Sequence, residues 1–296
     1  MTLPKISVLT PLYNTPPDAL RAMIESILAQ TYGVFEFLLL NDSPENQELG
    51  NVVLSYNDER IHYMENEHNM GIAKSRNKLI EMAQGKYLAV VDHDDISMPT
   101  RFELQVKFLE SNPHVGVVGG NVLEVRDNII ISKTNYPEND HDIKLSLINE
   151  HYVCTPNHPA SMIRASVLRD NGIRYNEKWT PCEDHALWLD LIDYTCFHNL
   201  PDVVLQYVWH GENTTTRTFQ RMYDILPIMI ERARTKYPIY YDEWKGQIQR
   251  TYQPQTRWIK LLGFIPFLKI AQRQGVKKIY LFGKIVLLKT KYVIRH

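Results

Sequence analysis

The chain has 296 residues, of which 44% are hydrophobic and 23% charged, which is ordinary for a soluble globular protein of one large or two modest domains. Three cysteines, Cys154, Cys182 and Cys196, are too few and too scattered for a disulfide framework or a zinc ribbon, and no apolar run reaches the roughly 18–20 residues of a membrane-spanning helix. Because the start leads directly into a short strand without a visible signal peptide, we expect a reducing, cytoplasmic setting.

The formal net charge of −1 hides an asymmetry along the chain. Residues 257–296 carry ten Lys and Arg and no acidic residue, which leaves 23 basic against 34 acidic side chains in the rest. An acidic body disfavours a nucleic-acid binder, and the basic tail is aliphatic rather than interleaved with stacking aromatic residues.

The first hundred residues alternate strand and helix signals. A helix is expected to open at Thr15, with Asp18 three residues on as in a capping box, and a second helix is expected over 71–84. Strands are predicted at 6–9, 35–40, 60–64 and 87–91. This alternation predicts an α/β protein with a doubly wound, mainly parallel sheet flanked by helices. Ligands of such sheets bind beyond the carboxyl ends of the strands, where Asp42 and an acidic cluster, Asp92, Asp94 and Asp95, are expected.

After Pro99 the pattern loosens. The helix signals lie at 101–110 and 183–194, the strand signals at 115–118, 128–132, 161–163 and 203–209, and a polar, irregular stretch at 135–158. Asp184 falls in the first turn of the later helix, where the macrodipole stabilises an anion, so this carboxylate is suited to remain ionised.

The basic tail contains a repeat, since residues 259–270 recur twenty residues later as 279–290. One interpretation is a packed C-terminal hairpin of short elements. The other is a helical, amphipathic attachment to a membrane surface, in which apolar side chains enter the interface and basic ones meet anionic headgroups. The concentration of charge in one segment favours membrane contact.

The acidic cluster can be a solvated turn that caps the helix beginning at Arg101, or a site for a cation. Side chains two apart on an extended backbone point the same way, so Asp92 and Asp94 can converge on one point if the chain stays extended there. Carboxylate oxygens suit Mg²⁺ or Mn²⁺, which commonly add phosphate oxygens as further ligands. His93 would point to the other side, where a structural role is expected.

Several short motifs occur in an order that resembles the family 2 glycosyltransferases, which have the GT-A fold. The resemblance covers roughly residues 5–210. Its motifs are Ser7-Val-Leu-Thr-Pro-Leu-Tyr-Asn14, Asn41-Asp42-Ser43, Asn69-Met-Gly-Ile-Ala-Lys-Ser-Arg-Asn77, Gly85-Lys-Tyr87, Asp92-His-Asp-Asp95, Arg174-Tyr-Asn176, Glu183-Asp184-His-Ala-Leu-Trp188 and Tyr207-Val-Trp-His210. It implies a glycosyltransferase domain over 1–220, with a nucleotide-sugar half (1–98) and an acceptor half (99–220), followed by a helical extension (221–296).

The resemblance also implies roles for individual residues. Asp184 would be the general base, and Asp94, Asp92 and His210 would bind Mn²⁺ or Mg²⁺. Contacts to the acceptor are assigned to His158 and Glu183. The nucleotide-sugar pocket would include Pro11, Tyr13, Asp42, Arg76, Asp92 and His93, with Asp42 accepting a hydrogen bond from uracil.

The implied activity is inverting transfer of a hexose or N-acetylhexosamine from a UDP-sugar to an oligosaccharide or lipid-linked saccharide. The product would be a β-glycoside in bacterial surface polysaccharide, made by an enzyme peripheral on the inner face of the membrane. The chain departs from the family pattern at Asn41-Asp42, where an acidic pair and a following glycine are usual, and at His93, which is larger than the usual alanine or serine.

Two other classes of protein stay open. A nucleotidyltransferase uses a similar sheet, but it would want a glycine-rich, basic loop after the first strand, which Thr10-Pro-Leu-Tyr-Asn-Thr-Pro-Pro17 is not. A non-catalytic sugar- or nucleotide-binding protein of the same fold would need a broken metal or base motif, and both motifs are intact.

Overall fold

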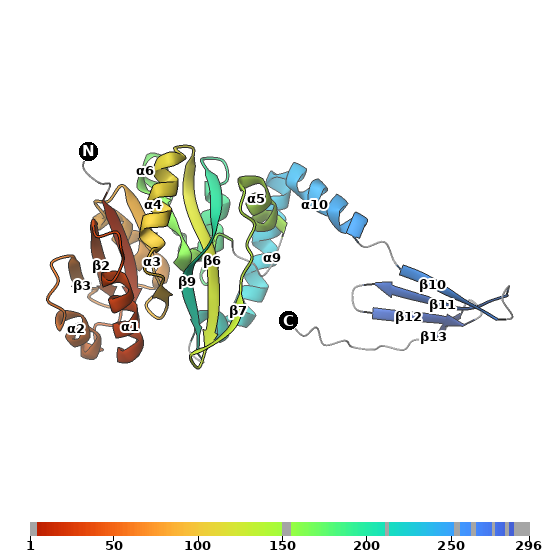
Figure 1. Ribbon diagram of the computed structural model, residues 1–296, viewed down its shortest axis with the longest axis horizontal. Coiled ribbons are helices and arrows are strands. Elements are labelled where there is room, and N and C mark those ends of the chain that lie inside the picture. The colour runs from red at the N-terminus through yellow and green to blue at the C-terminus, as the bar shows by residue number, and fades with distance from the viewer. Residues whose placement is uncertain are drawn as a thin grey trace. The chain divides into compact units, whose positions relative to one another are not determined.

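The computed structural model contains two compact units, residues 1–240 and 241–296, which are described separately (Figure 1). The structure describes residues 5–149, 155–210, 213–251, 255–261, 265–273, 276–281 and 284–286. None of the helices in these ranges combines the length and the apolar character that a bilayer crossing needs.

One mixed sheet organises the first unit (Figure 1). Its described strands are β1 (Ile6–Leu12), β2 (Phe35–Asn41), β3 (Ile61–Glu65), β4 (Tyr87–Val90), β5 (Ile96–Ser97), β6 (Val115–Arg126), β7 (Ile129–Lys133), β8 (Met162–Arg164) and β9 (Cys196–Trp209). They lie in the order β3-β2-β1-β4-β8-β6-β9-β5, and β7 pairs with β6. Strands β3, β2, β1 and β4 are parallel, β8 is antiparallel to both neighbours, and β6 and β9 are parallel again. The predicted α/β class is confirmed.

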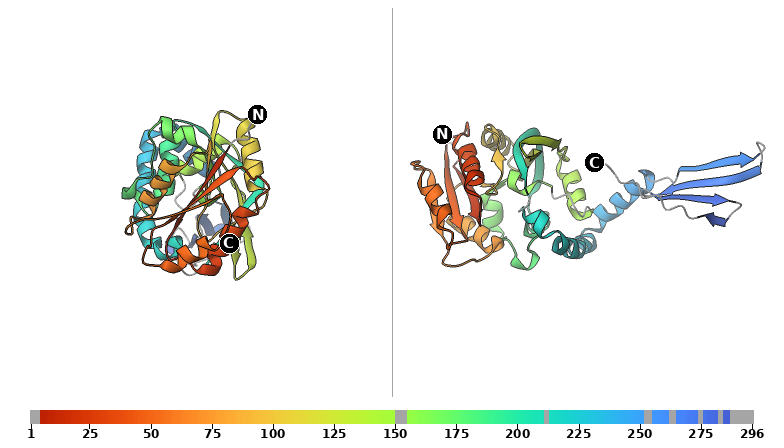
Figure 2. Two further views of the ribbon diagram at one scale, coloured as in Figure 1. Left: turned by 90° about the vertical axis from the view of Figure 1, so that its left-hand side faces the viewer. Right: turned by 90° about the horizontal axis from the view of Figure 1, so that it is seen from below.

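Helices cover both faces of this sheet, as Figure 2 shows. The described helices are α1 (Pro17–Leu28), α2 (Gln47–Leu54), α3 (Ile72–Met82), α4 (Arg101–Ser111), α5 (Asp140–Asn149), α6 (Ala165–Asp170), α7 (Glu183–Leu191), α8 (Thr214–Arg217), α9 (Phe219–Lys236) and α10 (Pro238–Thr251). Side chains alternate between the faces, so that Val8 packs with α1, α2 and α4 while Leu9 packs with α3, α5 and α7. Every residue of β1 and β2 is consequently buried.

The first helix has a buried apolar stripe but not the predicted cap. Leu20, Met23, Ile24 and Ile27 are fully buried. The helix begins at Pro17, whose fixed φ suits a first helical position, and its N-cap is Pro16 without a side-chain hydrogen bond. The capping box expected at Thr15 is therefore wrong.

The second half of the unit has longer elements than its pattern indicates. β6 and β9 pair in parallel along most of their lengths, whereas only 115–118 and 203–209 were expected as strands. Helix α5 lies in the stretch expected to be irregular, where Ile143, Leu147 and Ile148 are fully buried. Long-range packing decides both cases, because neither segment has a strong period of its own.

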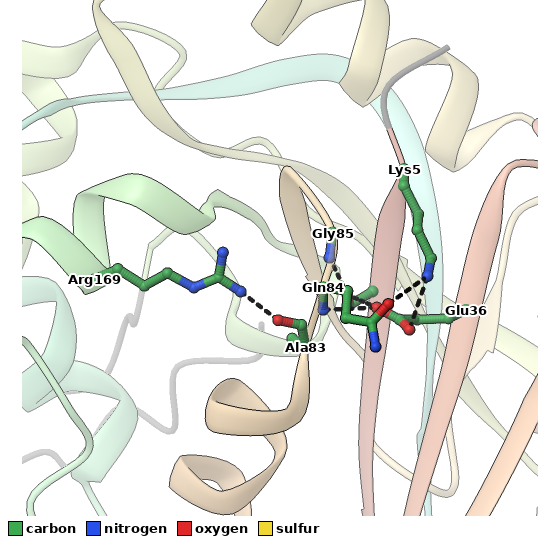
Figure 3. A network of polar contacts seen from close by, with 7 residues as sticks. Lys5, Glu36, Ala83, Gln84, Gly85 and Arg169 are labelled. Atoms are coloured by element: carbon green, nitrogen blue, oxygen red, sulfur yellow. Dashed lines mark hydrogen bonds and ion pairs between the residues drawn. The ribbon is translucent and has the colours of Figure 1, made fainter. Parts of the chain in front are cut away.

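A buried carboxylate fastens the amino ends of β1 and β2 to the turn before β4 (Figure 3). Glu36 Oε1 accepts hydrogen bonds from Ser7 Oγ at 2.5 Å and from the Gln84 backbone N–H at 2.8 Å. Glu36 Oε2 pairs with Lys5 Nζ at 3.0 Å. Burial alone would raise the pKa of Glu36, but these hydrogen bonds and Lys5 outweigh it and lower the pKa. The turn requires glycine at Gly85, since a Cβ there would lie 2.5 Å from the Ser7 backbone nitrogen.

The first compact unit runs to residue 240. Helix α9 buries Leu226, Met229, Ile230 and Ala233, which pack with side chains of that unit.

Among its described residues, the second unit contains helix in α10 alone. Beyond it, the described residues form an antiparallel sheet, β10 (Gln255–Leu261), β11 (Ile265–Arg273), β12 (Val276–Leu281) and β13 (Lys284–Val286), where a helical tail was expected. Segments rich in β-branched and aromatic residues favour strands over helices. The tail's side chains, on which the prediction of membrane contact rests, lie outside the described part of the chain.

Candidate functional site

The predicted polar residues gather where the parallel strands end. Asp42 follows β2 and Asp92 follows β4, and β1 lies between these two strands. Because carboxyl ends of parallel strands meet at one edge of a sheet, the loops that carry both aspartates belong to the same edge.

Asp42 is buried and its carboxylate shapes the loop before α3. Oδ1 accepts hydrogen bonds from Asn66 Nδ2 and from the Met70 N–H, both at 2.7 Å, and Oδ2 accepts one from the Gly71 N–H at 2.8 Å. Gly71 has a φ of 85°, which suits glycine. The orientation of Asp42 is thereby fixed.

The end of β1 presents one apolar and one aromatic side chain beside this loop. Pro11 is buried and lies opposite Leu40 of β2, whereas Tyr13 is 44% exposed. The next residue, Asn14, has a left-handed φ of 48°, and its N–H donates to Ser43 Oγ at 3.1 Å. Tyr13 therefore directly precedes a residue that is hydrogen-bonded to Ser43, and Ser43 directly follows Asp42.

The acidic cluster does not stay extended, so the prediction that Asp92 and Asp94 converge on one point is not met. β4 ends at Val90, and the chain turns at His93 and Asp94. Asp92 pairs with Arg76 at 2.9 Å, whereas Asp94 Oδ2 lies 2.8 Å from His210 Nε2. The two carboxylates have different partners.

His210 reaches Asp94 from the far end of β9 with the help of Asn213. The Asn213 side chain is buried, accepts a hydrogen bond from the His210 N–H at 2.6 Å and donates one to the Val208 carbonyl at 3.0 Å. Asp95 Oδ1 accepts the Val208 N–H at 3.0 Å. Two side chains therefore fix the segment that carries His210.

Asp95 is buried behind the turn, with Arg101 as a buried cation. Burial raises the pKa of Asp95, and the nearby Asp94 and Asp92 raise it further. Arg101 is fully buried, and it donates to the Val90 carbonyl at 2.8 Å and to Ser97 Oγ at 3.0 Å. Burial lowers the pKa of Arg101 to about 9, against the opposing effect of Asp95 and Asp92. Arg101 thus joins the end of β4 to β5 under the acidic turn.

Arg76 lies between the acidic turn and the start of α7. It is 7% exposed, and its NH1 and NH2 groups pair with Glu183 at 2.8 Å and Asp92 at 2.9 Å. Burial alone would lower the pKa of Arg76, but Asp92 and Glu183 outweigh it and raise the pKa. The guanidinium is therefore charged and already bound by carboxylates.

Of the pair at the start of α7, Asp184 is the more accessible. Glu183 is 5% exposed, whereas Asp184 is partly exposed and its Oδ1 accepts the His185 N–H at 2.7 Å. Burial raises the pKa of Asp184, with Arg76 acting in the opposite direction. The position in the first turn alone indicated an easily ionised carboxylate, but the effect of burial is larger.

His158, expected to meet an acceptor, lies inside the unit at 3% exposure. Its Nε2 is 2.8 Å from Tyr175 Oη, and its ring lies against Trp188 with centroids 5.7 Å apart. Burial lowers the pKa of His158 and raises that of Tyr175, so this hydrogen bond joins a neutral imidazole and a protonated phenol.

Buried polar atoms without a hydrogen-bond partner concentrate around this edge. Such atoms are rare in folded proteins, and a group of them indicates room for ligand atoms or water. Within the described residues they include Thr10 Oγ1, Thr15 Oγ1, Arg76 Nε, His93 Nδ1, Asp95 Oδ2, Glu183 Oε2 and Trp209 Nε1.

The donor atoms at the turn suit a divalent metal in part. Carboxylate oxygens of Asp92 and Asp94 and the imidazole nitrogen of His210 are ligands that Mn²⁺ and Mg²⁺ accept. No group of three His, Cys, Asp or Glu side chains converges on a single point within the described ranges. A metal bound here would therefore need further oxygen ligands from water or a substrate.

Four side chains that shape the candidate site were given no role by the sequence reasoning: Asn77, Arg101, Tyr175 and Asn213. Asn77 holds Tyr175 at both backbone groups, accepting its N–H at 2.9 Å and donating to its carbonyl at 2.8 Å. Two of these residues had a signal in the sequence. Arg101 directly follows Pro99-Thr100 and is a charged residue on the buried side of α4, and Asn213 lies just before a short helix.

Known proteins resemble this chain in sequence and in fold. Residues 7–171 match the model of the glycosyl transferase family 2. An uncharacterized glycosyltransferase of Methanocaldococcus jannaschii is 34% identical over 70% of this chain and 71% of its own. A UDP-Glc:α-D-GlcNAc-diphosphoundecaprenol β-1,3-glucosyltransferase of Escherichia coli is 32% identical over 80% of this chain and 90% of its own. A mannosyltransferase of Pyrobaculum calidifontis, solved with GDP-Man and Mn²⁺, aligns with 74% of this chain and 61% of its own at a TM-score of 0.56 and 16% identity, a likeness of fold.

Proposed function

Because the chain belongs to glycosyltransferase family 2 and has the GT-A fold, we propose that it transfers a hexose or N-acetylhexosamine from a UDP-sugar to a saccharide acceptor. The product would be a β-glycoside of a bacterial surface polysaccharide. The observation that carries the proposal is the meeting, through Arg76, of the acidic turn after β4 with the carboxylates at the start of α7.

The donor would lie across the ends of β1, β2 and β4. Tyr13 is exposed for stacking on a base, and Pro11 closes the apolar side. Asp42 would offer its carboxylate to uracil, although the Met70 and Gly71 N–H groups already occupy both of its oxygens. The choice of UDP is supported by the E. coli relative, whose name states a UDP-Glc donor.

The acidic turn would hold a divalent metal with the diphosphate. Asp94 and His210 are the side chains that would bind it, with Asp92 on the other side of the turn. Such an ion neutralises charge on a leaving diphosphate. Asp95 and Asn213 fix the backbone that carries His210, and Arg101 fixes the end of β4.

The base of the reaction would be Asp184. An acceptor hydroxyl is a poor nucleophile, so a base must take its proton as its oxygen attacks the anomeric carbon. The bond from that carbon to the diphosphate oxygen breaks, and its electron pair leaves with the nucleotide. One in-line displacement inverts the anomeric centre, so an α-linked donor gives a β-glycoside. Glu183 cannot share this role while Arg76 holds it.

The acceptor would be an oligosaccharide or a lipid-linked saccharide. The E. coli relative acts, by its name, on a saccharide carried by diphosphoundecaprenol, which supports a lipid-linked acceptor. An enzyme with such an acceptor would work at the inner face of the cell membrane, and residues 257–296 would supply the basic attachment.

Release of nucleotide from a panel of UDP-, GDP- and CMP-sugars, with Mn²⁺ and then with excess chelator, tests the proposal. We expect slow hydrolysis of one UDP-sugar, abolished by the chelator. If nucleotide release does not depend on metal, the acidic turn has a structural role and does not hold a cation. Preference for a GDP- or CMP-sugar would contradict the proposed donor.

A further inference from the structure

Three segments far apart in the sequence meet at the Arg76 guanidinium. Arg76 lies on α3, Asp92 follows β4, and Glu183 begins α7, 107 positions further along the chain than Arg76. The Arg76 and Glu183 side chains are 8% and 6% exposed, and that of Asp92 is 29% exposed. A buried arginine held by two carboxylates has one orientation, because its planar fork fits both at once.

The contacts of Arg76 leave it poorly placed to bind a diphosphate. NH1 is taken by Glu183 at 2.8 Å and NH2 by Asp92 at 2.9 Å. The Nε group is buried and has no partner among the described residues. A phosphate that bound NH1 or NH2 would have to displace a carboxylate from a buried ion pair and leave a charge unpaired.

A second contact fastens the same helix to the same side of the site. The ring of Tyr175 lies 5.5 Å from the Arg76 guanidinium carbon. Asn77, the next residue on α3, holds the backbone of Tyr175 through both its N–H and its carbonyl. Residues 76 and 77 therefore act together in fixing α3 against the segment that leads to α7.

Glu183 and Asp184 have different roles at the start of α7. Glu183 is the buried anchor, and the neighbouring Asp184 is partly exposed with its Oδ1 bonded to its own helix at 2.7 Å. Fixing Glu183 to Arg76 thus fixes the first turn of α7 and with it the direction in which Asp184 can point. The other end of the same bridge is Asp92, in the acidic turn.

We propose that Arg76 is a positioning residue. By holding Glu183 and Asp92 together, it fixes the position of the base Asp184 relative to the acidic turn. This inference rests on the proposed transfer reaction, and it differs from a role for Arg76 as a ligand of the ribose or diphosphate. A displacement of about 1 Å in a reacting group can cost on the order of 10²-fold in rate. The bridge is therefore expected to act on turnover rather than on donor binding.

Arg76→Lys tests this, with Arg60→Lys as the matched control. A lysine cannot reach two carboxylates with a planar fork. Arg60 is likewise bound by a carboxylate, Asp58, but belongs to the segment between α2 and β3. For each full-length variant, the dissociation constants of UDP and uridine, the turnover number and the melting temperature are measured.

For Arg76→Lys we expect a UDP affinity within about threefold of wild type and a turnover number lower by about 10²-fold, with Arg60→Lys near wild type. A UDP affinity at least tenfold weaker with unchanged uridine affinity would make Arg76 a diphosphate ligand and overturn the proposal. Normal turnover in Arg76→Lys would overturn it as well. A wild-type protein that binds no UDP and transfers no sugar would instead overturn the proposed function.

Glu183→Gln keeps the test informative if Arg76→Lys fails to fold. It removes one charge of the bridge and leaves Arg76 paired with Asp92. We expect a comparable loss of turnover at unchanged UDP affinity. Where Arg76→Lys folds as well, the double variant should lose little more than either single variant, since each substitution breaks the same bridge. Additive losses would show that the two residues act separately and would contradict the inference.

Discussion

Asp184 is the residue on which the proposed chemistry depends. Asp184→Asn keeps the shape and the hydrogen bond to the His185 N–H but cannot accept a proton. We expect a folded protein that binds UDP normally and transfers sugar at least about 10²-fold more slowly, the usual scale for a positioned base. Turnover near that of wild type would remove Asp184 from the mechanism.

The pH dependence of transfer gives a second measurement on the same residue. Burial raises the pKa of Asp184 above its ordinary 3.8, with Arg76 opposing the effect. A base acts when deprotonated, so kcat/KM should be constant at higher pH and fall as the pH drops through this raised pKa. The acidic limb should therefore lie above pH 3.8 and be absent from the residual activity of Asp184→Asn. An identical limb in both proteins would assign the titration to another group.

For single residues, the sequence predicted the candidate site residues better than it predicted their contacts. Asp42, Asp92 and Asp184 could be found because each follows a strand or opens a helix, which are local features. The ion pair of Arg76 with Glu183 spans 107 positions and carries no local signal. The burial of His158 was missed for the same reason, since its neighbour Trp188 comes from a helix thirty positions away.

Among the elements, the amino ends of β1 and β2 depend on one carboxylate. Glu36→Gln removes the charge that Ser7, Gln84 and Lys5 share, and it turns one acceptor oxygen into a donor group. We expect the free energy of unfolding at pH 7 to fall by about 1–3 kcal/mol, measured by urea denaturation. Glu59→Gln, at an exposed position, is the control and should be nearly neutral.

The sign of the pH effect follows from the lowered pKa of Glu36. A carboxylate with a folded-state pKa below its unfolded value contributes stability above the unfolded value, and this is lost as the pH falls through the folded value. The difference between wild type and Glu36→Gln should therefore shrink as the pH drops below about 4.5, the ordinary value for glutamate. A difference that stays constant down to acid pH would contradict this account of the network.

The elements that the sequence predicted well are those with a strong local period. In α1, four apolar side chains that repeat at helical spacing are fully buried. The extensions of β6 and β9 and the whole of α5 were missed, because parallel pairing between β6 and β9 and burial by distant helices decide them. The apolar run also predicted one residue too many for β4, which ends at Val90 before the turn at His93–Asp94.

For the whole molecule, the α/β class and the edge of the sheet that carries the site could be predicted, since alternation of strands and helices and the order of motifs are visible along the chain. The antiparallel insertion of β8 could not, because a three-residue strand has too short a pattern to reveal its direction. A helical, amphipathic tail was expected, with a packed hairpin of short elements as the alternative, and strands follow α10 in its described residues.

The opposite charges of body and tail lead to the last prediction. Residues 257–296 carry ten basic side chains and no acidic one, so the full-length protein should sediment with vesicles that contain anionic phospholipid and much less with zwitterionic ones. Binding should weaken between about 0.05 and 0.5 M salt, because surface charges are screened over a shorter distance. The double substitution Lys277→Glu/Lys278→Glu should reduce it, whereas Lys107→Glu/Lys133→Glu, on exposed positions of the body, should not. Equal binding by both double variants, or no binding at low salt, would favour a tail that packs only as a hairpin.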